Sequence, residues 1–197
     1  MFFILDEEIL EKDFYLRDPD EVAEDLLGKL MVREVDGEVL SGYVVETEAY
    51  FGRDDPASRA AQNGKTDMTE VMWGEPGTVF VYMVHGHWML NVVTGREGEP
   101  SAVLFRALEP EDGVDIMRDN RGRRDLEELC SGPGKLTQAL DIGKDLNKAN
   151  FCTEENLFIV DEDFEDFEIG RSKRIGVSED LEEPMRFYLG DSEFTSR

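Results

Sequence analysis

The sequence of 197 residues is short of several residue types and segments. Two cysteines and two histidines are too few for a disulfide framework and offer little to a metal ion. The chain has no run of 18 apolar residues, which excludes a transmembrane helix. Its start, MFFILDEEILEKDF, lacks the basic region and the small-residue cleavage site of a signal peptide. These absences favour a cytoplasmic protein that does not bind membranes.

Basic residues are scarce: 21 Lys and Arg face 46 Asp and Glu, which gives a net charge of −25 and a pI of about 4.3. Proteins that bind nucleic acids usually present a basic surface, so the bulk charge argues against such a partner. The acids are spread along the whole chain and only seven bases are lysines. This pattern favours a halophilic protein, because at 1 M salt the Debye length falls to about 3 Å and self-repulsion is screened. An ordinary acidic protein is the alternative.

The bases that remain gather in two islands. One contains Arg118, Arg121, Arg123 and Arg124, and the other Arg171, Lys173 and Arg174. In so acidic a chain, such islands are either phosphate contacts or partners of nearby acids, and the sequence leaves both open. The densest acidic stretch, residues 154–168, is interleaved with aromatic and aliphatic residues, so we expect a solvated strand and loop there.

Length and a 40% hydrophobic content predict a single domain over residues 1–197, with residues 1–12 loosely attached. Strand patterns paired as hairpins alternate with shorter helical patterns. This order predicts an α+β fold with a mainly antiparallel sheet, and not a doubly wound one. The expected elements are a helix over 18–28, hairpins over 29–50 and 79–93, a long loop over 53–76 with one helical turn near Glu70, a strand over 101–108 ended by Glu109-Pro110, helices over 111–119, 124–129 and after Pro133, and strands over 151–160 and 184–189.

Three groups of residues could support chemistry or binding. On a strand, Glu46, Glu48 and Tyr50 share one face, and two carboxylates about 7 Å apart could hold and activate a water, one raising the pKa of the other. A charged, exposed strand face is the alternative. The turn 85–88 holds both histidines and a tryptophan, so its tip could wedge between DNA base steps or dock a partner. A zinc pair and ordinary strand packing are its alternatives.

The third group is the turn SGPGKL at 131–136, where Gly134 and Lys135 open a helix and could cradle an anion. The spacing differs from that of a P-loop. Cys130, just before this turn, is expected to be a small buried side chain and not a nucleophile.

Six ordered segments resemble the alkyladenine (3-methyladenine) DNA glycosylase family, from about residue 13 to about residue 189. They are DFYLRDPDEVAEDLLGKLMVR, VVETEAY followed by DDPAS, PGTVFVYMVHGHWMLNVV, AVLFRALEP, LCSGPGKLTQAL, and RIGV with PMRFY. The resemblance implies a curved sheet with a protruding β-hairpin that intercalates in DNA. It also implies a monofunctional base-excision enzyme that works as a monomer on double-stranded DNA, flips out a damaged purine and hydrolyses its N-glycosidic bond, with no cofactor and no metal.

The same resemblance assigns roles to individual residues. Glu48 matches the general base that deprotonates the attacking water, and Arg106 matches the residue that helps to hold this water. Tyr50 and Tyr82 match aromatic residues that sandwich the flipped base. Asn91 matches an asparagine that selects against the exocyclic amine of guanine.

This chain departs from the family at two positions. His85 stands where a tyrosine usually intercalates, and its smaller ring would hold the flipped state less firmly. Arg59 stands where a histidine usually contacts the base; its backbone N–H would remain, but its guanidinium would repel a cationic methylpurine. We therefore expect a preference for neutral lesions such as hypoxanthine or ethenoadenine.

The basic islands become candidate phosphate contacts under this reading; the positions we single out are Gly134, Lys135, Arg121 and Arg124. Three other classes stay open: a lesion-binding protein without catalysis, a hydrolase of free nucleosides, and a metal enzyme that uses the two carboxylates and two histidines.

Overall fold

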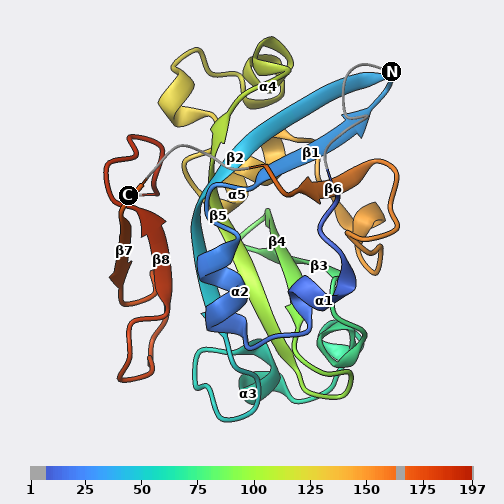
Figure 1. The fold of residues 1–197 in the computed structure, drawn as a ribbon, viewed down its shortest axis with the longest axis vertical. Helices are drawn as coiled ribbons and strands as arrows, with labels where there is room; N and C mark the ends of the chain where they lie inside the picture. Colours follow the sequence, from blue (N-terminus) through green and yellow to red (C-terminus); the bar gives the residue numbers. More distant parts are fainter. Residues whose placement is uncertain (1–7, 163–166, 197) are drawn as a thin grey trace.

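Figure 1 shows the computed structural model, which describes residues 8–162 and 167–196. One curled antiparallel sheet runs through the domain in the order β3-β4-β5-β2-β1-β6, and the β7–β8 hairpin joins it because β8 also pairs with β2. The strands are β1 (Leu30–Val35), β2 (Glu38–Tyr50), β3 (Val79–Val84), β4 (His87–Thr94), β5 (Ser101–Pro110), β6 (Leu157–Val160), β7 (Ile169–Ser172) and β8 (Arg186–Leu189). The prediction of an α+β domain with a mainly antiparallel, curved sheet is confirmed.

Two hairpins have the tight turns that the sequence predicts. Asp36 and Gly37, with φ of 52° and 83°, connect β1 to β2. His85 and Gly86, with φ of 50° and 84°, connect β3 to β4. Positive φ at both central residues is the signature of a type I′ turn, whose twist matches that of the strands. The second turn holds the exposed His85 side chain at the tip of its hairpin.

Short helices cover the sheet and connect its strands. They are α1 (Lys12–Tyr15), α2 (Pro19–Asp25), α3 (Arg59–Asn63), η1 (Glu70–Trp73), α4 (Val114–Arg121), η2 (Leu126–Glu128), α5 (Pro133–Ala139) and η3 (Lys144–Leu146). In Figure 1, α2 lies across the sheet in front of β2. The buried Thr47 hydroxyl on β2 donates a hydrogen bond of 2.7 Å to the carbonyl of Ala23 on α2. The alternation of β2 therefore points Thr47 to this helix, and its neighbours Glu46 and Glu48 to the opposite face.

The structure corrects several expected boundaries. β5 continues through Glu109 to Pro110, which pairs with Gly42. Pro110 is tolerated because it is the last residue of its strand, and Gly42 permits the close approach: a Cβ there would lie 2.7 Å from the Glu109 carbonyl oxygen. The loop over 53–76 contains α3 as well as the expected turn near Glu70. The strand expected over 151–160 is limited to β6.

Four elements of the described chain were not expected: the helices α1, α3 and η3 and the strand β7. The prediction of a loose segment over residues 1–12 falls partly on residues 1–7, outside the described part of the chain. Within the described part, Ile9 forms an isolated bridge with Val160, and the Leu10 N–H donates to the Ile159 carbonyl. Residues 163–166 of the acidic stretch also lie outside the described ranges.

The main core lies between the sheet and the helices, and its largest fully buried rings are Tyr15, Phe105, Phe151 and Phe187. No helix in residues 8–162 and 167–196 has the length and apolar character needed to cross a membrane.

Candidate active site

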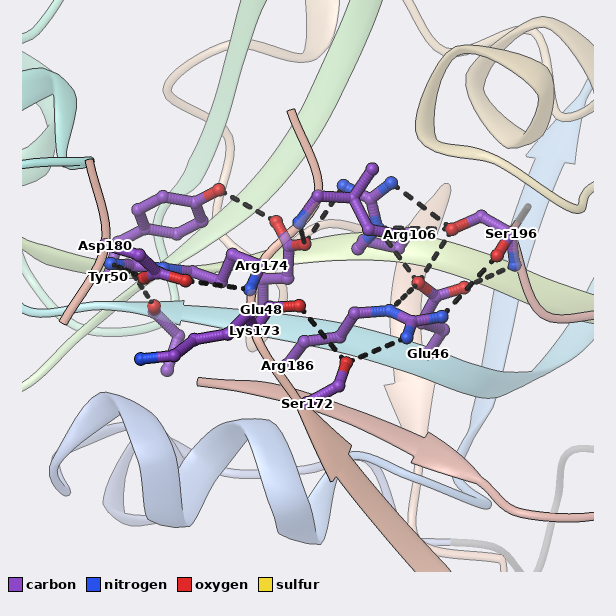
Figure 2. A network of polar contacts seen from close by, with 12 residues as sticks. Glu46, Glu48, Tyr50, Arg106, Ser172, Lys173, Arg174, Asp180, Arg186 and Ser196 are labelled. Atoms are coloured by element: carbon purple, nitrogen blue, oxygen red, sulfur yellow. Dashed lines mark hydrogen bonds and ion pairs between the residues drawn. The ribbon is translucent and has the colours of Figure 1, made fainter. Parts of the chain in front are cut away.

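A buried polar network lies where β2, β5 and β8 meet, on the face of β2 that points away from α2 (Figure 2). Glu46 and Glu48 are both fully buried on β2, and Arg106 on β5 lies between them, 3.0 Å from Glu46 and 3.2 Å from Glu48. The β2–β5 register slips by one residue at Glu46, which pairs with Ala107, and is restored at the pair Thr47–Phe105. Such irregularities re-aim side chains and are common beside active sites.

Glu48 has three close partners. Its Oε2 accepts a hydrogen bond of 2.8 Å from the Tyr50 hydroxyl, and its Oε1 accepts one of 2.8 Å from the Ile175 N–H and faces the Arg106 guanidinium. The predicted common face of Glu46, Glu48 and Tyr50 is therefore confirmed by their contacts. A carboxylate offers about four acceptor positions, so one position of Glu48 remains for a water.

The pKa of Glu48 is raised above its usual range, chiefly because burial removes water from the carboxylate. The Arg106 charge and the hydrogen bonds from Ile175 and Tyr50 oppose this rise. Repulsion from Glu46 adds to it but is the smallest cause. The pKa of Glu48 is therefore raised, as expected, but mainly by desolvation and not by Glu46. Arg106 lies between the two carboxylates, and its positive charge weakens their repulsion.

Glu46 accepts four hydrogen bonds from protein groups. Its Oε1 accepts from Arg106 Nε at 3.0 Å, from Arg186 Nε at 2.6 Å and from the Ser196 hydroxyl at 2.7 Å, and its Oε2 accepts from the Ser196 N–H. Arg186 and Ser196 were not predicted. They lie 140 and 150 residues from Glu46 in the sequence, and no local pattern connects positions so far apart.

A second buried ion pair adjoins Tyr50. Arg174 donates two hydrogen bonds to Asp55, at 2.6 and 2.7 Å, and one of 2.8 Å to Asp180. Its guanidinium lies 4.6 Å from the centre of the Tyr50 ring. Arg174 belongs to an island that we expected to meet phosphates, and that expectation is wrong for this residue because it is only 5% exposed. The chain after β7 is thereby fixed where the Ile175 N–H meets Glu48.

A cavity of about 570 Å³ opens in front of this network, a size typical of pockets for small molecules. Three partners of Glu48, namely Tyr50, Arg106 and Ile175, form part of its wall. Glu48 thus lies directly behind the wall. The other predicted residues that line the cavity are Arg59, Tyr82, His85 and Asn91.

The predicted base-binding residues keep distinct positions in this cavity. The Arg59 guanidinium lies 5.3 Å from the centre of the Tyr82 ring, and Tyr82 stacks on Phe80 at 4.9 Å. Asn91 is buried, and its amide donates to the carbonyls of Phe80 and Met89 at 3.1 and 3.3 Å. These bonds fix the orientation of the amide at the cavity wall.

The phosphate-contact candidates differ in how much of each side chain is available. Arg121 donates to Gln138 and to the carbonyls of Leu129 and Glu128, so its guanidinium is already engaged. Lys135 forms an exposed ion pair of 2.8 Å with Glu128.

Arg124 is exposed, and within the described ranges its side chain has no ion-pair or hydrogen-bond partner. Gly134 on α5 packs against His87 on β4, so closely that a Cβ at position 134 would lie 2.8 Å from the His87 Cβ. This contact holds α5 against the hairpin.

Two other side chains bear on alternative chemistries. Cys130 is buried, as predicted, and burial raises the pKa of its thiol to about 12, which leaves it protonated. No group of three or more His, Cys, Asp or Glu residues in the described part of the chain is arranged to hold a metal ion.

A buried carboxylate behind a cavity lined by aromatic residues is an arrangement found in hydrolases that use a carboxylate as base or nucleophile. The model of the methylpurine-DNA glycosylase family matches residues 13–193. A relative from Desulfitobacterium hafniense is 41% identical over 199 residues, and one from Alkaliphilus oremlandii is 41% identical over 200 residues. Each match covers 95% of this chain and 98% of the relative, and each relative is named "Putative 3-methyladenine DNA glycosylase". The chain belongs to the methylpurine-DNA glycosylase family.

Proposed function

We propose that this protein excises damaged purines from double-stranded DNA as a monofunctional glycosylase in base-excision repair. Family membership and the names of the relatives support the DNA glycosylase class. The observation that carries the reaction is Glu48: a fully buried carboxylate with a raised pKa and one unused acceptor position, beside a cavity of suitable size.

In the proposed reaction, the damaged nucleotide is flipped out of the duplex and its base enters the cavity. A water held by Glu48 and Arg106 attacks the anomeric carbon of the deoxyribose. The oxygen–carbon bond forms, the glycosidic electron pair leaves with the base, and Glu48 takes a proton from the water. The Glu48 carboxylate also stabilises the positive charge that develops on the sugar.

Three residues of the cavity suit the recognition of a purine. Tyr50 and Tyr82 present aromatic rings on which a base can stack, an interaction worth about 1–3 kcal/mol per base. Asn91 is held by two backbone carbonyls, so it keeps its place when a base arrives. In the proposed complex it meets the purine edge and disfavours the exocyclic amine of guanine.

The hairpin tip suits the separation of the flipped nucleotide from its stack. His85 is exposed at the tip and lines the cavity mouth, so its ring can fill the space that the nucleotide leaves. Of the phosphate-contact candidates, Arg124 has the side chain most available to a phosphate, because it is exposed and has no ion-pair or hydrogen-bond partner in the described part of the chain.

We propose a preference for neutral lesions over cationic ones. The Arg59 cation lies over Tyr82 in the same cavity, so a base that stacks on Tyr82 would lie beside a positive charge. At an effective dielectric constant of about 20, two like charges 4 Å apart repel by about 4 kcal/mol. A cationic N3- or N7-methylpurine would therefore bind less well than hypoxanthine.

The decisive experiment is single-turnover excision of hypoxanthine from a duplex, with the free nucleoside and an EDTA-treated reaction run in parallel. We expect excision from the duplex, none from the nucleoside, and no effect of EDTA. Binding without excision would support the non-catalytic alternative, and cleavage of the nucleoside alone would support a nucleoside hydrolase. Loss of activity in EDTA would support the metal enzyme.

A further inference from the structure

The guanidinium of Arg106 is held along one edge and meets Glu48 at the other. Its Nε donates to Glu46 at 3.0 Å and to the Ser196 hydroxyl at 3.3 Å, and its Nη2 donates to the same hydroxyl at 3.2 Å. Its Nη1 is the atom that lies 3.2 Å from Glu48. Figure 2 shows this order, with Ser196 at one end of the network and Tyr50 at the other.

Arg186 on β8 is a second arginine that holds Glu46 in place. Its Nε donates to Glu46 at 2.6 Å, and its Nη1 donates to the Ser172 hydroxyl on β7 at 2.9 Å. Four separate segments, β2, β5, β8 and the chain around Ser196, therefore meet at one carboxylate. Each contact to Glu46 removes freedom from Arg106, because Glu46 cannot turn without breaking three other bonds.

Fold stability alone does not account for this arrangement. Buried ion pairs are often no more stabilising than apolar side chains of similar volume, because charged groups lose their hydration when buried. Here two arginines, the Ser196 hydroxyl and the Ser196 N–H all donate to the one carboxylate of Glu46. Of the described residues that contact the Glu46 carboxylate, only Arg106 also lines the cavity.

We propose that Ser196 and Arg186, acting through Glu46, are positioning residues that fix Arg106 against Glu48 for the excision reaction. The inference rests on the proposed function and extends it to residues that touch neither the base nor the water. Glu46 then serves as the anchor of Arg106 and not as a second base.

Loss of the Arg106 anchor should change the pH dependence of the excision rate. The Arg106 charge lowers the pKa of Glu48 against the rise caused by burial. An unanchored Arg106 would exert this effect less, so the pKa of Glu48 would rise further and the base would be protonated at a higher pH. The charged and titratable groups around Glu48 are Glu46 and Tyr50 on β2, Arg106 on β5, Arg174 after β7, and Arg186 on β8.

The test compares Ser196→Ala, Ser196→Thr and the control Ser192→Ala. Ser192 lies in the same segment, and its hydroxyl accepts from the Phe194 N–H outside the network. Single-turnover excision of hypoxanthine is measured from pH 5 to 9, together with duplex affinity and Tm. For Ser196→Ala we expect a rate about 10- to 100-fold lower at pH 7, since small displacements of positioning groups have effects of this size, with affinity within about twofold.

The acidic limb of the Ser196→Ala profile should move to higher pH, so that the deficit shrinks as pH rises. Ser196→Thr, which keeps the hydroxyl, should recover most of the rate, and Ser192→Ala should match the wild type. A Ser196→Ala protein with a lower Tm but the wild-type rate and profile would overturn the inference. A wild-type protein that excises nothing would instead refute the proposed function.

Arg186→Lys provides a second variant if Ser196→Ala does not fold. It keeps the charge but removes the Nε donor to Glu46. We expect the same rise of the acidic limb and the same unchanged affinity. A wild-type profile in this variant would count against the inference as strongly as in Ser196→Ala.

Discussion

The interior network and the cavity mouth differ in how their charged side chains are paired. In the interior, Glu46 and Arg174 have every charged contact satisfied by protein groups and are almost fully buried. At the mouth, Arg59 and His85 have no carboxylate partner among the described residues, and Arg59 rests on an aromatic ring. The charged groups of the interior are therefore held by protein contacts before a substrate binds, whereas Arg59 and His85 keep hydrogen-bonding groups that a substrate could meet.

The largest expected effect is at Glu48. Glu48→Gln removes the proposed base and should lower single-turnover excision by at least about 10²–10⁴-fold, the usual contribution of a general base. Lesion-duplex binding should persist, because the cavity wall is unchanged. Glu38→Gln, at the exposed start of the same strand, is the matched control. Excision at the wild-type rate in Glu48→Gln would show that another group activates the water.

The pH profile of the wild type adds to this test. Because burial raises the pKa of Glu48, excision should fall, as pH is lowered, at a higher pH than an ordinary glutamate would give. An acidic limb at the pKa of an ordinary glutamate would show that the catalytic base lies outside the buried network.

The next effect concerns stability, at the other end of the interior network. Arg174→Met leaves Asp55 buried without a counter-ion, which should lower the free energy of unfolding by about 3–5 kcal/mol. For a chain of this size, each kcal/mol lowers Tm by about 2–4 °C. Arg171→Met removes an exposed pair with Glu24 and should cost at most about 1 kcal/mol. Equal Tm values for the two variants would remove the distinction between a rigid interior and an adaptable surface.

A smaller effect is expected at the hairpin tip. His85→Ala should slow excision by roughly 10-fold, because the ring that fills the emptied stack is lost. His85→Tyr, with a larger ring, should restore or exceed the wild-type rate. Stopped-flow fluorescence with a fluorescent lesion such as ethenoadenine would report the flipped population directly. An unchanged flipped population in His85→Ala would remove His85 from the proposed interface.

A still smaller change should alter selectivity and not speed. Arg59→Gln removes the cation above Tyr82, so the ratio of hypoxanthine to 3-methyladenine excision should fall several-fold, within the limit set by repulsion of a few kcal/mol. Arg53→Gln is the control, since Arg53 lies over Trp73 and outside the cavity. Faster excision of 3-methyladenine than of hypoxanthine by the wild type would refute the preference itself.

The smallest effect is that of salt. With a net charge of −25, the fold should gain stability as ionic strength rises, because repulsion among surface acids is screened. Few bases are available for phosphates, so duplex affinity should depend only weakly on salt. The slope of log K against log salt concentration should be less steep than the value of about −6 to −10 seen when many phosphates are contacted. A Tm that falls between 0.1 and 2 M KCl would argue against salt adaptation.

The sequence predicted what depends on local patterns. The hairpin turns at 36–37 and within 85–88, and the common face of Glu46, Glu48 and Tyr50, follow from residues at short spacing. Sequence reasoning failed where the contact joins distant segments. Glu46 meets Ser196 across 150 residues, and Arg174 meets Asp55 across 119. Whether an arginine faces solvent or the interior depends on such contacts, and not on the charge of its neighbours.

The register of β2 has a consequence for how this chain can change in length. β2 pairs with β5 along one edge, and with β1 and then β8 along the other, and the register with β5 before the slip at Glu46 equals the register after it. Inserting one residue between Val44 and Glu46 would exchange the faces of the residues that follow and turn Thr47 toward the cavity. Inserting two would keep the faces but bring Glu46 to the place of Glu48. In β2, a change in the number of residues is therefore far more disruptive than a substitution, and an odd change also exchanges the two faces of the strand.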